Sequence, residues 1–199
     1  MRRTILAAIA AIGAAAFGAG AAQAQIADPA DENGAMYCVY NALTETADYE
    51  LVAEAFLYDD LTDVEIKTAA ELLDKATRDC ATAHKLSESQ TASASDIGIY
   101  GATADYLSDE LMFEDVSDEA IDGIYDVMTD MSDDELDKLY GDDWRSDLAF
   151  STKLKTALVA KGIPDDDFAV ETSFQIIELA VMALDSVTLF VLGDEDEES

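Results

Sequence analysis

The sequence of 199 residues is poor in basic side chains: 11 lysines and arginines stand against 44 aspartates and glutamates, which gives a formal charge of −33. Proteins that bind nucleic acid or anionic lipid neutralise phosphate with lysine and arginine, so this imbalance argues against both partners. Histidine occurs once, which excludes the paired Glu-x-x-His motifs of di-iron bundles. The motifs of phosphate-binding loops, zinc proteases and serine hydrolases are also missing. We therefore expect neither a resident cofactor nor a resident metal.

Proline is scarce as well, with two residues, while 50% of the residues are hydrophobic. This combination argues against a disordered chain despite the charge. No alternating apolar and polar stretch flanked by turn residues predicts a β-hairpin, whereas apolar residues recur at helical spacing. We expect an all-α protein, a helical bundle of about six helices, in a single domain over residues 25–193.

The amino-terminal residues have the pattern of a secretory signal. Two arginines at positions 2 and 3 precede an apolar run that ends in Ala22-Gln23-Ala24. We expect a signal peptide over 1–24 and cleavage between Ala24 and Gln25, which would leave a chain two charges more negative. A membrane anchor is the alternative, but the run is mostly alanine and glycine and therefore weakly apolar. The expected location is the periplasm or the extracellular space.

Cysteine occurs twice, at Cys38 and Cys80, and in an oxidising compartment such a pair is usually bonded. Apolar residues at helical spacing predict one helix over about 35–58 and a second over 63–85. A chain reversal near Asp60 would bring the cysteines level, so we expect an N-terminal disulfide-linked helical hairpin over 25–86. The alternative is a metal site that adds His84, but the helix dipole already explains a histidine near a helix carboxyl end.

Local capping signals place the remaining helices. Three serine or threonine residues followed by acidic residues mark helix starts, at Thr62, Ser117 and Ser132. The sequence Gly-Ile-Pro after Lys161 predicts a Schellman motif at the end of a helix over 143–161. Further helices are expected over 96–113, from 118, over 133–141 and over 168–192. Residues 87–95 have no apolar period and are interpreted as a linker, which makes 96–193 the helical core.

The segment 168–192 has the strongest apolar signal and is long enough to cross a membrane. Glu171, Gln175, Glu178 and Asp185 form a polar stripe along it, and ionised carboxylates are costly inside a bilayer. We interpret the segment as the central helix of the bundle and expect no membrane span in the mature protein. The acidic residues 194–199 that follow are interpreted as a solvated tail.

Charge is unevenly distributed along the chain. Residues 96–144 hold 17 acids and one base, and residues 163–199 hold 11 acids and no base. Residues 145–162 reverse this balance, with four bases and one acid. We expect this basic segment to lie against acidic neighbours and to relieve their repulsion.

These patterns favour a non-enzymatic binding or interaction module of the cell envelope, whose acidic surface attracts a basic protein or peptide. One alternative is low-affinity binding of divalent cations such as calcium by clustered carboxylates, at Asp59, Asp60 and Asp63 or at Asp142 and Asp143. Residues 118–129 resemble a calcium loop but lack ligands at Ala120 and Thr129. A second alternative is a hydrolase with a carboxylate pair such as Glu178 and Asp185, which requires a raised carboxyl pKa within a cleft.

Overall fold

The computed structural model describes residues 34–46, 49–141 and 143–192. These residues form eight α-helices and two short 3-10 helices, with no β-strand among them, which confirms the all-α prediction. The number of helices exceeds the expected six. The signal peptide, its cleavage site at Ala22, Ala24 and Gln25, and the acidic tail lie outside the described residues.

The described residues divide into two compact units. We call residues 34–103 and 183–192 the disulfide unit, and residues 104–182 the α6–α8 unit. Helix α5 (Glu88–Phe113) and helix α9 (Asp167–Leu192) each contribute residues to both units. The division therefore falls within two helices and not at the linker expected over 87–95.

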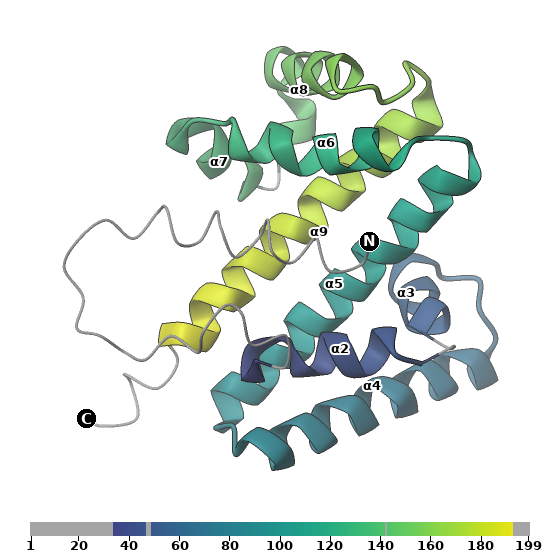
Figure 1. The fold of residues 1–199 in the computed structure, drawn as a ribbon, viewed down its shortest axis with the longest axis vertical. Helices are drawn as coiled ribbons and strands as arrows, with labels where there is room; N and C mark the ends of the chain where they lie inside the picture. Colours follow the sequence, from purple (N-terminus) through teal and green to yellow (C-terminus); the bar gives the residue numbers. More distant parts are fainter. Residues whose placement is uncertain (1–33, 47–48, 142, 193–199) are drawn as a thin grey trace. The chain divides into compact units, whose positions relative to one another are not determined.

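The disulfide unit begins with η1 (Ala35–Tyr37), α2 (Cys38–Thr44), α3 (Tyr49–Leu57) and α4 (Asp63–His84). Both α2 and α3 pack on α4 (Figure 1). The prediction of one helix over 35–58 is wrong because α2 ends at Thr44. Thr46 bonds the carbonyl oxygen of Leu43 through both its hydroxyl (2.7 Å) and its amide (3.0 Å), and such local bonds compete with continued helix.

Helix α4 begins at the predicted capping box. The amide of Thr62 donates to Oε2 of Glu65 at 2.9 Å, and the amide of Glu65 donates to Oγ1 of Thr62 at 3.4 Å. Two amides that the helix leaves without partners are thereby bonded. This start is confirmed.

The expected linker over 87–95 is wrong, because α5 begins at Glu88. Its start is a second capping box, in which the amide of Ser87 donates to Oε1 of Gln90 and the amide of Gln90 donates to Oγ of Ser87, both at 3.2 Å. The apolar period is absent because the residues of this segment that are buried, Ser93 and Ala94, have small or polar side chains. A Cβ added at Gly98 would lie 2.5 Å from Cγ1 of Val39, so α2 and α5 approach closely.

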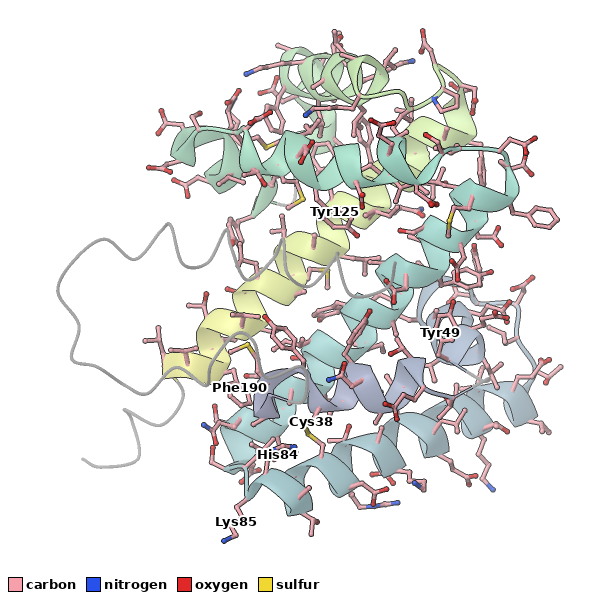
Figure 2. The ribbon with its side chains drawn as sticks, in the orientation of Figure 1. Cys38, Tyr49, His84, Lys85, Tyr125 and Phe190 are labelled. Carbon is pink, nitrogen blue, oxygen red and sulfur yellow. A yellow bond between two sulfur atoms is a disulfide. The ribbon has the colours of Figure 1, made fainter. Side chains whose placement is uncertain are left out.

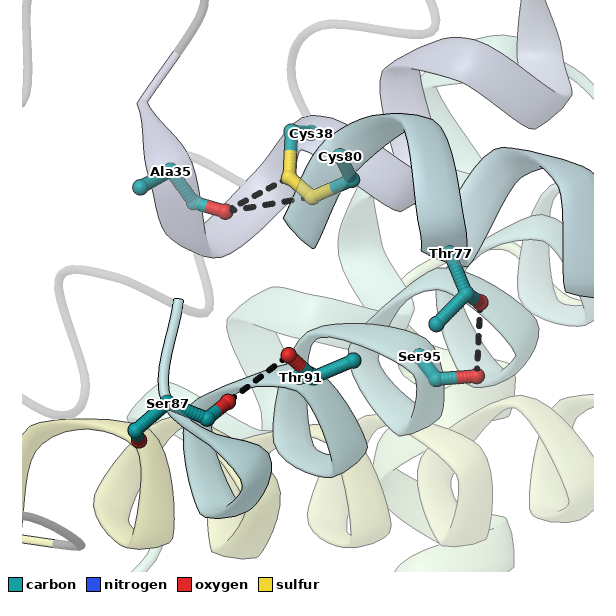
Figure 3. The surroundings of a disulfide bond; sticks show 7 residues. All are labelled: Ala35, Cys38, Thr77, Cys80, Ser87, Thr91 and Ser95. Atoms are coloured by element: carbon teal, nitrogen blue, oxygen red, sulfur yellow. Dashed lines mark hydrogen bonds between the residues drawn. A yellow bond between two sulfur atoms is a disulfide. The ribbon is translucent and has the colours of Figure 1, made fainter. Parts of the chain in front are cut away.

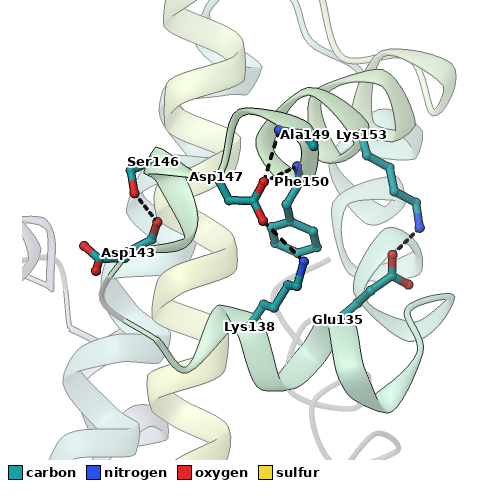
Figure 4. A network of polar contacts seen from close by, with 8 residues as sticks. All are labelled: Glu135, Lys138, Asp143, Ser146, Asp147, Ala149, Phe150 and Lys153. Carbon is teal, nitrogen blue, oxygen red and sulfur yellow. Dashed lines mark hydrogen bonds and ion pairs between the residues drawn. The ribbon is translucent and has the colours of Figure 1, made fainter.

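The α6–α8 unit contains α6 (Asp118–Thr129), α7 (Asp133–Leu139), η2 (Trp144–Ser146) and α8 (Leu148–Ala160). The predicted helix over 143–161 is therefore divided. Asp147 ends η2 and caps α8, since its Oδ1 accepts the amides of Ala149 and Phe150 at 3.1 Å each (Figure 4).

The predicted Schellman motif at the end of α8 is confirmed. The amide of Ile163 donates to the carbonyl oxygen of Leu158 at 3.2 Å, and the amide of Gly162 donates to the carbonyl oxygen of Val159 at 3.1 Å. Gly162 has a φ of 106°, a conformation that a residue with a Cβ rarely adopts.

Helix α9 is the one helix among the described residues that is long and apolar enough to cross a membrane, and 50% of its most apolar stretch is buried. In the α6–α8 unit its Ile176 and Ile177 are fully buried. Phe174 meets the buried Trp144 edge to face, with ring centroids 5.2 Å apart. The apolar side of α9 in this unit thus packs against protein.

Candidate binding site

The predicted disulfide joins Cys38 at the start of α2 to Cys80 in the last turns of α4 (Figure 3). The two Cα atoms are 5.7 Å apart, within the range that a disulfide bridges. Cys80 is 5% exposed, and the carbonyl oxygen of Ala35 lies 2.8 Å from Sγ of Cys38. The bond is confirmed, and it ties α2 to α4.

The alternative metal site with His84 loses its thiolates, because both cysteines are in the disulfide. His84 is exposed as the final residue of α4, where the helix dipole favours it (Figure 2). Within the described ranges, no three His, Cys, Asp or Glu side chains are grouped to hold a metal ion.

Of the proposed cation clusters, Asp59, Asp60 and Asp63 are exposed, and Asp142 is outside the described residues. The calcium-like residues 118–129 form helix α6 instead of a loop.

Glu178 and Asp185, the carboxylates suggested for a hydrolase, differ in their surroundings. Glu178 accepts hydrogen bonds from Arg145, while Asp185 is exposed in the disulfide unit. Burial raises the pKa of Asp96, also in the disulfide unit, but this residue does not line the pocket described next.

A pocket of about 270 Å³ opens between α6, α7 and α8. Its apolar lining includes Val127, Met131, Phe150, Leu154 and Ala157. Three of these, Val127, Phe150 and Leu154, are almost fully buried and also belong to the core of the unit. The pocket is therefore built from side chains that packing holds in place, as is usual for binding sites.

Two features of the local sequence position the elements that line the pocket. Gly123 lets α8 approach α6, since a Cβ there would lie 2.7 Å from Cβ of Lys161. The capping box at the start of α7 orients Glu135: Oγ and the amide of Ser132 donate to its Oε2, at 2.9 and 3.2 Å. The capping box predicted at Ser132 is therefore confirmed, like the one at Thr62.

Ion pairs cross the rim of the pocket. Lys153 donates to Oε1 of Glu135, which joins α8 to α7 (Figure 4), and Nζ of Lys161 lies 3.0 Å from Oδ2 of Asp126 and 3.8 Å from Oδ2 of Asp130. The bond from Lys153, followed by those from Ser132, lowers the pKa of Glu135 to about 2. The side chain of Lys153 is 67% exposed, so solvent screens this pair and its contribution to stability is small.

A row of carboxylates runs along α6 from the pocket. Asp118, Asp122, Asp126 and Asp130 are exposed and follow one another at intervals of four residues, over a length of about 18 Å; we call them the α6 acidic row. In the described part of the chain, ion pairs reach Asp126 and Asp130 but join no basic side chain to Asp118 or Asp122. Like charges at this spacing destabilise a helix by about 0.2–0.5 kcal/mol per pair.

The basic segment 145–162 pairs with acidic neighbours, as its charge predicts. Arg145 donates from Nε and Nη2 to the two carboxylate oxygens of Glu178, at 2.6 and 2.7 Å, and also pairs with Glu171. Its guanidinium lies 5.3 Å from the ring centroid of Trp144. The bonds from Glu178 are the main reason that the pKa of Arg145 is raised. Lys153, Lys155 and Lys161 also pair with carboxylates, so all four bases of the segment have acidic partners.

The polar interior of the α6–α8 unit includes Tyr125, whose side chain is labelled in Figure 2. It is 3% exposed, and burial, together with the nearby carboxylate of Asp105, raises the pKa of its hydroxyl. Asp105 is itself buried in α5, and the neighbouring Ser108 donates to the carbonyl oxygen of Ala104 at 2.8 Å. Sequence reasoning did not single out these residues, because nothing local distinguishes Asp105 from the other acids of α5.

Comparison of the chain with protein family models, with curated proteins and with solved structures finds no match.

Proposed function

We propose that the protein is an exported, non-enzymatic binding module for a basic protein or peptide. The observation that carries the proposal is the α6 acidic row, in which Asp118 and Asp122 have no basic partner within the described residues. The sequence offers 17 acids and one base over 96–144, so the repulsion in this region is relieved mainly by cations from outside it.

Electrostatics supports a cationic partner in two ways. A surface of one sign of charge steers a partner of opposite charge and raises its association rate. A bound lysine or arginine also removes the like-charge repulsion between successive carboxylates of the row. An oxidising compartment is supported by the disulfide between Cys38 and Cys80, because such bonds persist mainly in exported proteins.

The test is a binding titration with a fluorescently labelled lysine-rich decapeptide at several salt concentrations. The double variant D118N/D122N removes two unpaired charges of the row, and D59N/D60N removes two exposed charges elsewhere. Each lost contact contributes up to about 1 kcal/mol, so we expect about tenfold weaker binding for D118N/D122N and little change for D59N/D60N.

Affinity should also fall as salt rises, because exposed charge pairs are screened. Equal weakening by the two double variants would show that only total charge matters and would reject the α6 acidic row as the site. Absence of measurable binding at low salt would reject the proposed function itself.

A further inference from the structure

We propose that the pocket between α6, α7 and α8 holds one apolar side chain of the basic partner, of the size of leucine or methionine. The lysines or arginines next to that side chain then lie along the α6 acidic row. This inference rests on the proposed function and specifies the partner: a peptide with one aliphatic anchor beside a series of basic residues.

The shape and lining of the pocket favour an aliphatic anchor. The volume of about 270 Å³ lies just below the range of sites for drug-sized ligands, so it suits a single side chain better than a cofactor. Of the residues that line it, Met131 and Ala157 are partly exposed, while Phe150 and Leu154 are buried. A side chain entering here covers apolar surface that water now contacts, which favours binding.

The position of the charges places the basic residues of the partner. Asp130 belongs both to the lining of the pocket and to the α6 acidic row, so the row begins at the mouth of the pocket. Successive carboxylates are about 6 Å apart along the helix, which is close to the spacing of alternate residues in an extended peptide, about 6.6 Å. A peptide anchored in the pocket can therefore present every second side chain to the row.

An anionic amphiphile is a poorer occupant than a cationic peptide. The two lysines at the rim, Lys153 and Lys161, are already paired with Glu135, Asp126 and Asp130. A carboxylate head group would have to displace one of these acids while remaining next to the rest of the acidic row. A cationic peptide side chain instead finds carboxylates without a basic partner among the described residues, since Asp122 and Asp118 lie about one and two turns beyond Asp126 along α6.

The experiment compares two peptides of equal charge, with lysines at alternate positions and either leucine or alanine at the anchor position. Each is titrated into the wild-type protein, into A157L and A160L, which add bulk to the pocket lining, and into A149L, which adds the same bulk at an exposed position of α8 outside it. Circular dichroism and the melting temperature establish that each variant is folded.

For the wild type, we expect the leucine peptide to bind about tenfold more tightly than the alanine peptide. A157L and A160L should abolish this difference while retaining the binding of the alanine peptide, and A149L should leave the difference intact. If the two peptides bind equally well to the wild type, the anchor pocket is refuted and the proposed function stands. If neither peptide binds, both proposals fail. A last measurement uses decanoate as an anionic amphiphile. If decanoate binds tightly, A157L abolishes that binding and the leucine peptide does not compete with it, the pocket belongs to an anionic amphiphile and this inference is overturned.

Discussion

The substitution Gly98→Ala tests how closely α2 packs against α5. A Cβ at this position would lie 2.5 Å from Cγ1 of Val39, 2.9 Å from its Cβ and 3.2 Å from the amide nitrogen of Tyr40. Unstrained carbon contacts are about 3.5–4.0 Å, so one helix has to move by about 1 Å. Because backbone as well as side chain is in the way, a change of rotamer does not relieve the clash.

Two opposing effects decide the sign of this substitution. Alanine is favoured over glycine inside a helix by about 0.5–1 kcal/mol. Adding a methyl group to a packed core costs about 1–3 kcal/mol. We therefore expect a net loss of about 1–2 kcal/mol in the free energy of unfolding, which for a chain of this size lowers the melting temperature by about 2–8 °C.

Urea unfolding followed by circular dichroism measures this loss. Ser89→Ala, at an exposed position of α5, is the control and should be neutral or slightly stabilising. The disulfide at Cys38 restrains α2 directly beside the contact, so the cost of Gly98→Ala should shrink when both cysteines are replaced by serine. A Gly98→Ala protein as stable as the wild type would refute the close packing of α2 against α5.

Reduction of the disulfide between Cys38 and Cys80, which spans 42 residues of sequence, should destabilise the protein by up to about 4 kcal/mol, as measured by unfolding with and without a reductant. Arg145→Lys should lower the free energy of unfolding by about 1–2 kcal/mol, because lysine cannot reproduce the two parallel bonds to the half-buried carboxylate of Glu178. Calorimetry that finds no loss of stability would contradict a stabilising role for these two bonds. Glu135 has a pKa lowered from 4.5 to about 2, so its ion pair stabilises the fold fully above pH 4.5 and is lost as the pH falls towards 2. Carboxyl NMR titration of Lys153→Ala should show this pKa rising, and an unchanged midpoint would exclude Lys153 as its main cause.

Features that depend on a few neighbouring residues were predictable from the sequence. The capping boxes at Thr62 and Ser132 and the Schellman motif at Gly162 each follow from side-chain chemistry within one turn. The disulfide followed from the number of cysteines and the helical spacing around Cys38 and Cys80.

Features that depend on tertiary packing were not predictable. The first turns of α5 lack an apolar period because their buried side chains, Ser93 and Ala94, are small or polar, so the sequence alone indicates a linker there. Nor does the sequence show that Gly98 lies against Val39 of α2. The basic character of 145–162 predicted acidic neighbours, but not that Arg145 would select Glu178, 33 residues away. The pocket requires three helices to meet around Met131 and Phe150, and no single segment shows it.

Salt distinguishes the proposed binding function from simple adaptation of the acidic surface to a saline environment. With 44 acids and 11 bases, repulsive pairs outnumber the attractive pairs, so screening should raise the melting temperature under either hypothesis. In D118N/D122N this rise should be smaller than in D59N/D60N, because the α6 acidic row places like charges on successive turns of one helix. Binding of a basic peptide should respond in the opposite sense and weaken with salt. A protein that gains stability with salt while its affinity for the peptide stays constant would therefore not be recognising that peptide through the α6 acidic row.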